Sequence, residues 1–383
     1  MMSNVSSKRN TRILNHRQRP TNRTAPPTEA IDRQRAKAAR LHYRLDTSAG
    51  IQRKPNGKSF TYVNPRGQKV RDRRLLERIN GLVIPPAWKN VWINPDPQGH
   101  LQATGIDAAG RKQYRYHDRW RTSQDRAKYE KVLEFARALP RIHRRVSADL
   151  RKRSLPREKV LAGVIRLLEI TLIRVGNEES SLNNHTYGLT TMRDRHVAIT
   201  GQEVCFDFRG KSGIAHEILI NDAGLARLIK QCRHVPGQKL FQYVDEDGES
   251  QNVHAGDVNE YIRESSGGDF SAKDFRTWAA TALTIELLQD LDEFNSPTAA
   301  KQDVRRTIKL VAERLGNTTE VCRKSYIHPA VIEGYLAGMV TRGIKPRHKR
   351  RKRPLGLEFA GSRTRVLDSL QKLISHARRG PKS

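Results

Sequence analysis

Positive charge limits how this chain can fold. Its 72 Lys and Arg residues exceed its 40 Asp and Glu residues and leave a formal net charge of +32. A surplus of this size destabilises a compact state by self-repulsion unless a polyanion neutralises it, and nucleic acid is the commonest such partner. An anionic membrane surface is the alternative, but no stretch of the sequence is apolar enough to span a bilayer.

Two basic segments lie at the ends of the chain. Residues 1–40 are polar, basic and almost free of large apolar residues, which predicts a disordered basic arm. Residues 345–354 form a second basic run inside a C-terminal tail that we assign to residues 341–383. A nuclear localisation signal is one interpretation of this run, and a solvated tail that contacts DNA is the favoured one.

Short β-like segments fill the region that follows the arm. Residues 60–63, Phe-Thr-Tyr-Val, precede the turn signal Asn-Pro-Arg-Gly at residues 64–67, and similar runs recur as far as His117. Residues 41–120 are therefore predicted to form a small, mostly antiparallel, β-rich lobe that binds DNA.

From about residue 124 the pattern becomes helical. Apolar residues recur at helical spacing at 160–172, for example. A β interlude follows, because residues 204–208 and 217–220 flank the turn at 209–213. Residues 121–340 are therefore predicted to form a larger, mainly helical catalytic lobe with a short hairpin or three-stranded sheet. The two lobes together place the chain in the α+β class.

Two later helices carry residues typical of helix ends. Ser271 and Asp274 form a capping-box pattern ahead of an apolar run. Ser296 followed by Pro297 is typical of a helix start, and Gly316 is typical of a helix end. We expect helices that begin at these serines, the second of which ends at Gly316.

The three cysteines, Cys205, Cys232 and Cys322, lie far apart in the sequence. This spacing fits neither a disulfide framework nor a zinc module and indicates a reducing interior. The N-terminus has charge but lacks the apolar segment of a secretory signal. We expect the protein in the cytoplasm with the bacterial nucleoid, and in the nucleus only if its source is eukaryotic.

The sequence shows no recognisable site for a metal or a nucleotide. Gly210-Lys211-Ser212 resembles the end of a Walker loop, but that loop needs a glycine five residues before Gly210, where Cys205 stands. No cluster of Asp and Glu suits a two-metal nuclease. We therefore expect phosphodiester chemistry without a cofactor.

Five residues of the helical lobe offer the groups that break and reseal a DNA strand without a metal. They are Arg174, Lys211, Arg276, Asn317 and Tyr326. Arginine stabilises charge on phosphate oxygens through forked hydrogen bonds, and lysine protonates a departing sugar oxygen. A tyrosine oxygen that attacks phosphorus forms an ester, which stores the bond energy for resealing without ATP.

Each of these residues alone also has an ordinary structural explanation. Arg174 can complement a helix dipole, Lys211 can be a solvated lysine in a turn, and Arg276 can lie on a phosphate-contacting helix face. Asn317 can be a helix cap, and Tyr326 can be a half-buried tyrosine. The argument therefore depends on all five settings occurring together.

The five settings and their order resemble the type IB DNA topoisomerases, in the compact form of poxviruses and bacteria, from about Gly50 to Met339. The settings are Leu-Ile-Arg-Val-Gly-Asn-Glu, Phe-Arg-Gly-Lys-Ser-Gly, Lys-Asp-Phe-Arg-Thr-Trp, Leu-Gly-Asn-Thr and Cys-Arg-Lys-Ser-Tyr-Ile-His-Pro. The resemblance implies that Arg174 and Arg276 clamp the transition state, with Lys273 as an accessory phosphate contact. It also implies that Lys211 is the general acid. Tyr326 is then the nucleophile of a 3′-phosphotyrosyl intermediate.

Asn317 departs from the family pattern, in which the fifth member is often histidine. Asparagine still donates a hydrogen bond to a non-bridging oxygen, but it carries no positive charge, which allows a weaker clamp. Cellular-type relatives with asparagine make the change tolerable. The spacing of His216 and His328 argues against either of them as the missing histidine.

A second match lies in the β-rich lobe, where residues 110–116 resemble the segment that poxvirus enzymes place in the major groove. The candidate DNA contacts there are Arg111, Lys112, Gln113, Tyr114 and Tyr116. Glutamine reads base edges, tyrosine touches bases or phosphates, and the basic residues hold the backbone. An amphipathic strand with a basic face is the alternative.

The sequence thus predicts a monomeric, two-lobed clamp around double-stranded DNA, with the lobes joined near residues 118–124. It would relax supercoils without a nucleotide cofactor. A tyrosine site-specific recombinase or resolvase uses a similar set of residues and is the nearest alternative. A non-catalytic, basic DNA-packaging protein is the alternative from another class.

Overall fold

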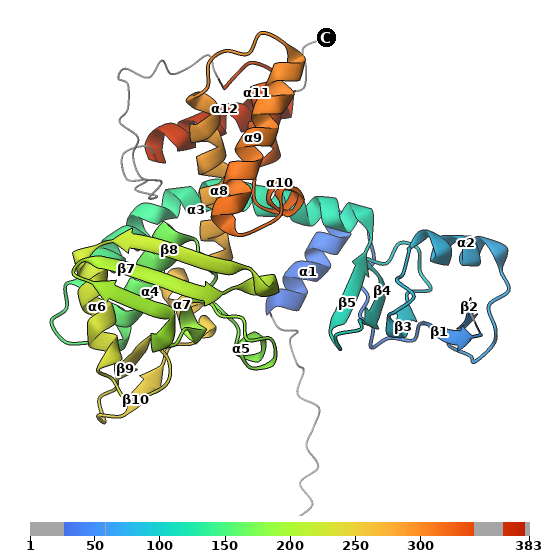
Figure 1. Ribbon diagram of the computed structural model, residues 1–383. Helices are drawn as coiled ribbons and strands as arrows, with labels where there is room; N and C mark the ends of the chain where they lie inside the picture. Colours follow the sequence, from blue (N-terminus) through green and yellow to red (C-terminus); the bar gives the residue numbers. More distant parts are fainter. Residues whose placement is uncertain (1–26, 58, 341–362, 380–383) are drawn as a thin grey trace, which may run out of the picture. The chain divides into compact units, whose positions relative to one another are not determined.

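The computed structural model describes three parts of the chain, residues 27–57, 59–340 and 363–379. They divide into two compact units between Ala127 and Lys128 (Figure 1). Within these described ranges, no helix is both long and apolar enough to cross a membrane. Residues 1–26 and the basic run at 345–354 lie outside the described residues, so what the sequence predicts for them remains a prediction.

The first unit contains a five-stranded antiparallel sheet in the order β2-β1-β3-β4-β5. Its elements are α1 (Pro27–Ala38), β1 (Ile51–Asn56), β2 (Ser59–Val63), α2 (Arg73–Gly81), β3 (Lys89–Ile93), β4 (Leu101–Ile106) and β5 (Lys112–Tyr116). Ile79 of α2 is buried in one apolar cluster with Ile51 and Ile93 of the sheet. The sheet confirms the antiparallel, β-rich N-terminal part expected from the sequence.

Helix α1 falls inside the stretch 1–40 that the sequence analysis assigns to a basic arm. Ala36 of this helix is fully buried in a small cluster with Leu41 and Trp120. The helix contributes only a small side chain to this cluster, so it needs no periodic run of large apolar residues. Sequence periodicity could not reveal it for that reason.

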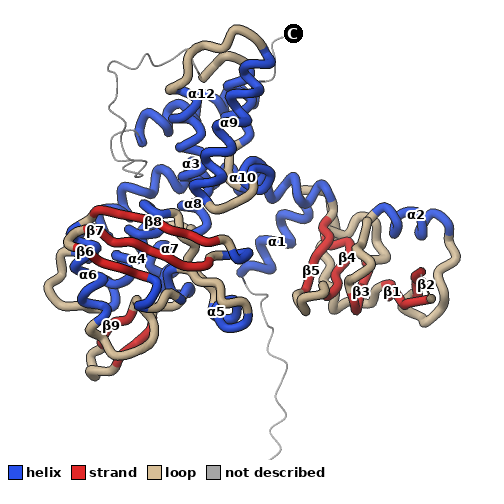
Figure 2. Tube along the Cα trace, viewed as in Figure 1, coloured by secondary structure: helices blue, strands red, loops and turns tan. Residues whose placement is uncertain are grey.

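The second unit is mainly helical and also contains the antiparallel sheet β6-β7-β8 and the hairpin β9-β10 (Figure 2). Its helices are α3 (Asp118–Leu150, which begins in the first unit), α4 (Arg157–Thr171), α5 (Glu178–Asn183), α6 (Ala223–Arg233), α7 (Ala255–Ser266), α8 (Ala272–Gln289), α9 (Pro297–Leu315), α10 (Thr319–Ser325), α11 (Pro329–Leu336) and α12 (Arg363–Arg379). Its strands are β6 (Val197–Thr200), β7 (Glu203–Arg209), β8 (Ala215–Asn221), β9 (Gln242–Val244) and β10 (Ser250–Asn252). This content confirms the predicted α+β class.

Helix α8 is the central element of the second unit, because it packs against α4, α7, α9, α11 and α12. Its residues from Phe275 to Ile285 are buried on every side. Helix α4 is almost as completely buried between Lys159 and Leu168. Helices that are buried on every side belong to the core. The core therefore fixes the backbone positions of the residues at the ends of α4 and α8.

Both predicted helix starts are present. The backbone N–H of Ser271 donates to the Asp274 carboxylate over 2.8 Å as α8 begins. The hydroxyl of Ser296 accepts from the N–H of Ala299 at the start of α9, and α9 ends at Gly316 with φ of 58°. Glycine adopts this left-handed conformation without strain. The predictions for these helix boundaries are confirmed.

Helix α12 falls inside the stretch 341–383 that the sequence analysis assigns to a basic tail. Three apolar side chains of this helix, Val366, Leu370 and Leu373, are buried, and the helix packs against α8 and α11. The described part of the tail is therefore attached to the core of the second unit.

Replacing Leu370 by alanine is expected to lower the free energy of unfolding by about 2–5 kcal/mol, because the change leaves a cavity beneath α12. Urea denaturation followed by circular dichroism measures the change, and Lys372→Ala on the exposed side of the same helix is the matched control. Equal stability of the two variants would contradict the packing of α12.

Candidate active site

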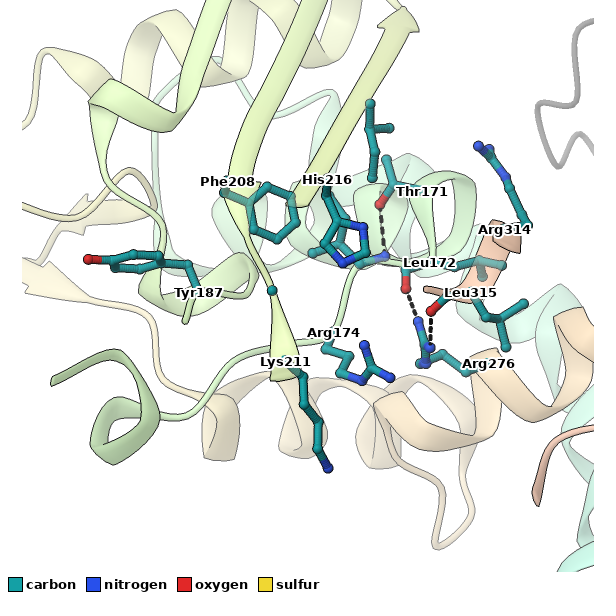
Figure 3. A pocket seen from close by; sticks show the side chains of 13 residues that line it. Thr171, Leu172, Arg174, Tyr187, Phe208, Lys211, His216, Arg276, Arg314 and Leu315 are labelled. Carbon is teal, nitrogen blue, oxygen red and sulfur yellow. Dashed lines mark hydrogen bonds between the residues drawn. The ribbon is translucent and has the colours of Figure 1, made fainter. Parts of the chain in front are cut away.

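Arg174 lies just beyond the end of α4. The helix ends at Leu172, which has a left-handed φ of 58°, so the chain turns away from the helix axis there. The carbonyl oxygen of Arg174 then accepts a hydrogen bond of 2.9 Å from the N–H of Leu189. This contact fixes the backbone from which the guanidinium reaches the pocket shown in Figure 3.

Lys211 lies in the turn between β7 and β8. The N–H of Gly210 donates to the carbonyl of Ile214 over 2.8 Å, and Ser212 adopts a φ of 66°. The Lys211 side chain is exposed and lines the same pocket as Arg174. Its ammonium makes no hydrogen bond or ion pair with any residue in the described part of the chain, so it is available to a bound anion.

Arg276 of α8 is buried, with only 4% of its surface exposed. It donates to the carbonyl oxygen of Leu172 at the end of α4, and to that of Leu315 at the end of α9 over 2.7 Å. Burial, together with the nearby charge of Arg174, lowers the pKa of Arg276 to about 10. Its Nε–H has no partner among the described residues.

Asn317 follows the left-handed Gly316 and faces Arg174. The Arg174 guanidinium donates to the Asn317 side-chain oxygen over 2.5 Å. Since arginine can only donate hydrogen bonds, the atom of the Asn317 amide that contacts Arg174 must be its oxygen. The NH₂ group of the amide therefore points away from this contact. That NH₂ group is buried without a partner in the described structure. Asn317 thus holds an unused donor next to Arg174.

Tyr326 lies at the end of the short helix α10. Its N–H donates to the carbonyl of Cys322 over 3.0 Å, and its own carbonyl accepts from the Thr281 hydroxyl of α8 over 3.1 Å. The Thr281 oxygen in turn accepts from the N–H of His328 over 3.1 Å. One buried hydroxyl therefore holds the backbone on both sides of Ile327.

The Tyr326 ring is half-buried, and its centroid lies 5.4 Å from the guanidinium carbon of Arg276. Burial by itself raises the pKa of the phenol, but the charge of Arg276 and its side-chain hydrogen bond with the phenol, together with the charges of Arg174 and Lys273, outweigh that effect. The pKa of Tyr326 therefore lies below its ordinary value, which favours ionisation of the phenol.

The five candidate catalytic residues come from separate elements and converge in the second unit. Arg174, Lys211, Arg276 and Tyr326 line one groove with Lys273, and Asn317 is bonded to Arg174. The described residues that line this groove include no Asp or Glu. Such a concentration of unopposed positive charge favours a bound anion.

The segment proposed for groove contact forms strand β5 in the first unit. Tyr114 and Tyr116 are exposed and stack with their ring centroids 5.9 Å apart and their planes at 8°. Lys112 shares this face, and its ammonium lies 2.6 Å from the Asp46 carboxylate.

Gln113 lies on the opposite face of β5, because successive side chains of a strand alternate. Its amide donates to the Asp107 carboxylate over 2.8 Å. Arg111, just before the strand, also pairs with Asp107, over 2.9 Å. The structure therefore separates the two tyrosines from Gln113, which the sequence analysis grouped as one set of contacts.

The two histidines weighed against Asn317 occupy different positions. His328 caps α11, where its Nδ1 accepts from the N–H of Ala330 over 3.1 Å. His216 instead lines the pocket with Arg174, Lys211 and Arg276. The sequence analysis did not include His216 among the site residues, although its place just after the Lys211 turn was a signal that could have found it.

Comparison with known proteins identifies the family. The family model for the catalytic core of eukaryotic DNA topoisomerase I matches residues 117–343, and that for the N-terminal domain of bacterial DNA topoisomerase IB matches residues 59–107. DNA topoisomerase 1B of Acanthamoeba polyphaga mimivirus is 32% identical over 293 residues, which cover 75% of this chain and 87% of that protein. The chain belongs to the type IB DNA topoisomerases.

A more distant type IB relative gives the same result. DNA topoisomerase 1B of vaccinia virus, strain Copenhagen, is 23% identical over 289 residues, which cover 73% of this chain and 87% of the viral protein. The resemblance and the enzyme class predicted from the sequence, a DNA topoisomerase, are confirmed. Membership of the family disfavours the recombinase and packaging alternatives.

The five candidate catalytic residues of this type IB topoisomerase all lie within the matched core, residues 117–343. The groove-contact segment at 110–116 lies between the two matched ranges. The individual roles of all these residues stay predictions. Among the residues that the structure describes, no three His, Cys, Asp or Glu side chains are grouped so that they could hold a metal ion.

Tyr326 is expected to ionise at a lower pH than an ordinary tyrosine, and Lys273→Ala is expected to raise its pKa, because the substitution removes one of the charges that lower it. The difference in tyrosinate absorbance between the wild type and Tyr326→Phe, followed over pH, isolates this phenol. The same difference, measured in the Lys273→Ala background, gives the shift. A shift to lower pH, or no shift, would contradict the electrostatic argument.

Proposed function

We propose that this type IB topoisomerase relaxes supercoiled DNA by a transient break in one strand, with Tyr326 as the nucleophile. The observation that carries the proposal is the convergence of two arginines and Lys211 on Tyr326 in one groove, without an acidic side chain among the described lining residues. A groove of this charge favours a phosphodiester of the DNA backbone.

In the cleavage step the Tyr326 oxygen attacks phosphorus and forms a new P–O bond, while the bond from phosphorus to the 5′-oxygen of the next nucleotide breaks. The phenol loses its proton to solvent, and the departing 5′-oxygen gains a proton from Lys211. The products are a 3′-phosphotyrosyl ester and a 5′-hydroxyl. The broken strand rotates, and the hydroxyl then attacks the ester to restore the phosphodiester without ATP.

Arg174, Arg276 and Asn317 are proposed to bind the non-bridging phosphate oxygens. Buried donors without partners are costly, and the Nε–H of Arg276 and the NH₂ of Asn317 are two of them. A phosphate oxygen would satisfy these donors, and it would do so most strongly when charge builds up in the transition state. Because asparagine is neutral, we expect its contribution to be smaller than that of a charged histidine.

Lys211 is proposed as the general acid and Lys273 as an accessory phosphate contact. The Lys211 ammonium has no described partner and lies in the same pocket as Arg174. Arginine and lysine side chains thus supply the positive charge and the proton that the reaction requires. We therefore expect neither a metal nor a nucleotide cofactor.

We further propose that a single chain closes as a clamp around duplex DNA, with the β5 face in a groove and the second unit at the cleaved strand. The fall of affinity with salt should be steep, by roughly 0.9 log units per log unit of salt for each phosphate neutralised. The boundaries 1–40, 41–120, 121–340 and 341–383 for arm, lobes and tail are part of this proposal. The cytoplasmic, nucleoid-associated localisation expected from the sequence also stays a prediction.

Replacing Tyr326 by phenylalanine is expected to abolish relaxation of a supercoiled plasmid, because the change removes the attacking oxygen and little else. Wild-type enzyme mixed with end-labelled duplex and stopped with SDS should yield a covalent adduct with a free 5′-hydroxyl, and the variant should yield none. Binding of uncleaved duplex by the variant is the control for folding.

Relaxation by the wild type should persist in EDTA without ATP. Relaxation by Tyr326→Phe above a trace would overturn the assignment of the nucleophile. A strict requirement for a metal or for ATP would overturn the proposed mechanism.

Tyr114→Ala is expected to change the choice of cleavage sites more than Gln113→Ala, because Tyr114 is exposed while the Gln113 amide is bonded to Asp107. Cleavage sites mapped on end-labelled duplex measure the change. Deletion of residues 1–26, which spares α1, is the control that should flatten the salt dependence and keep the cleavage pattern. If Tyr114→Ala left the pattern of cleavage sites unchanged, β5 would be interpreted as a strand that binds phosphates without reading the base sequence.

A further inference from the structure

His216 occupies a place in the pocket that the proposed reaction does not use. It stands on β8 directly opposite Phe208 of β7, and the two rings stack with centroids 5.1 Å apart and planes at 16°. Figure 3 shows the imidazole beside Phe208 and above Arg174. The ring is half-buried and forms no hydrogen bond with any residue that the structure describes.

The imidazole fills the space between two turns. A side-chain carbon placed on Gly210 would lie 2.6 Å from the His216 ring, and one placed on Gly316 would lie 2.5 Å from it. Both distances are too short for real contacts, so each position can hold only glycine while the ring is there. Gly210 precedes Lys211 in one turn, and Gly316 precedes Asn317 in the other.

One backbone hydrogen bond holds the start of the Lys211 turn, where the carbonyl of Arg209 accepts from the N–H of Tyr187 over 2.7 Å. From Gly210 to Ile214, the backbone hydrogen bonds within the described structure are internal ones, between Gly210 and Ile214 at 2.8 Å and between Gly213 and Gly210 at 3.1 Å. The turn also contains Ser212 in a left-handed conformation, which is unfavourable for a residue other than glycine. Contact with the imidazole therefore joins this turn to the end of α9.

The ring must also be compatible with its charged neighbours. Arg174 and Arg276 face it, and Lys211 and Arg314 line the same pocket. Burial and the charges of Arg174 and Arg276 lower the pKa of His216, so the neutral ring is favoured. A neutral aromatic spacer adds no further charge to a crowded cationic site.

We propose that His216 is a positioning residue that holds the Lys211 turn against the Gly316–Asn317 turn, so that the proton donor and the phosphate-binding amide address the same phosphodiester. The inference rests on the general-acid role proposed for Lys211. Proton transfer requires the donor to lie close to the atom that receives the proton. Moving the donor by about 1 Å lowers the rate on the order of 100-fold.

The test compares single-turnover cleavage of two duplexes that differ in one atom. One carries the normal 5′-oxygen at the cleavage site, and the other carries a 5′-bridging sulfur, which leaves without needing a proton. His216→Ala is expected to cleave the oxygen substrate about 10- to 100-fold more slowly than the wild type. On the sulfur substrate its rate should return to within about threefold of the wild type, since no general acid is needed.

Four other variants make the comparison specific. His216→Phe keeps a flat, neutral ring on Phe208 and should cleave both substrates within about threefold of the wild-type rate. Glu217→Ala, the exposed neighbour on β8, should match the wild type on both substrates. Lys211→Ala should be slow on oxygen and restored by sulfur, whereas Arg174→Ala should be slow on both.

Partial loss of folded enzyme lowers both rates alike and cannot produce selective restoration by sulfur. The inference would be overturned if His216→Ala cleaved the oxygen substrate at the wild-type rate, or if it were equally slow on the oxygen and sulfur substrates. It would also be overturned if His216→Phe cleaved the oxygen substrate as slowly as His216→Ala. Failure of sulfur to restore Lys211→Ala is a separate result. It would remove the general-acid role of Lys211 and the positioning role of His216 with it.

Discussion

The buried guanidinium of Arg276 is the contact on which the rest of the site depends. It bonds the last carbonyl groups of two helices, at Leu172 and Leu315, and so brings together the segments that carry Arg174 and Asn317. A buried cation without a carboxylate partner is unfavourable unless its donors are satisfied. The two carbonyl oxygens accept hydrogen bonds from part of the Arg276 guanidinium, and a bound phosphate would supply the negative charge that the guanidinium lacks.

This arrangement links stability to substrate binding. Arg174 and Arg276 repel one another, which contributes to the lowered pKa of Arg276, and Lys273 adds a further positive charge to the lining of the groove. A ligand that binds only the folded site stabilises it. In the proposed function, a DNA phosphate bound in this groove would offset the repulsion between the two arginines.

The sequence predicted what local residue types determine. Caps at Ser271, Ser296 and Gly316 follow from the hydrogen bonding of single residues, and the local settings picked out the five residues that the structure brings together. The unpredicted features depend on contacts distant in sequence. The burial of Ala36 by Trp120 and the packing of His216 against Gly316 leave no periodic pattern in the sequence. The separation of Gln113 from Tyr114, by contrast, follows from strand alternation alone, and the sequence analysis could have used it.

Asn317 and Tyr326 flank a single short helix, α10 (Thr319–Ser325), whose far end is held by the Thr281 hydroxyl. The backbone of the proposed nucleophile is therefore joined through one short helix to that of the residue proposed to bind the phosphate. In the proposed reaction, the cleaved DNA end would be tethered to the same short segment that carries Asn317. The rotating strand would then return to a phosphorus atom held beside the same helix, and accurate rejoining would depend on the seven residues of α10.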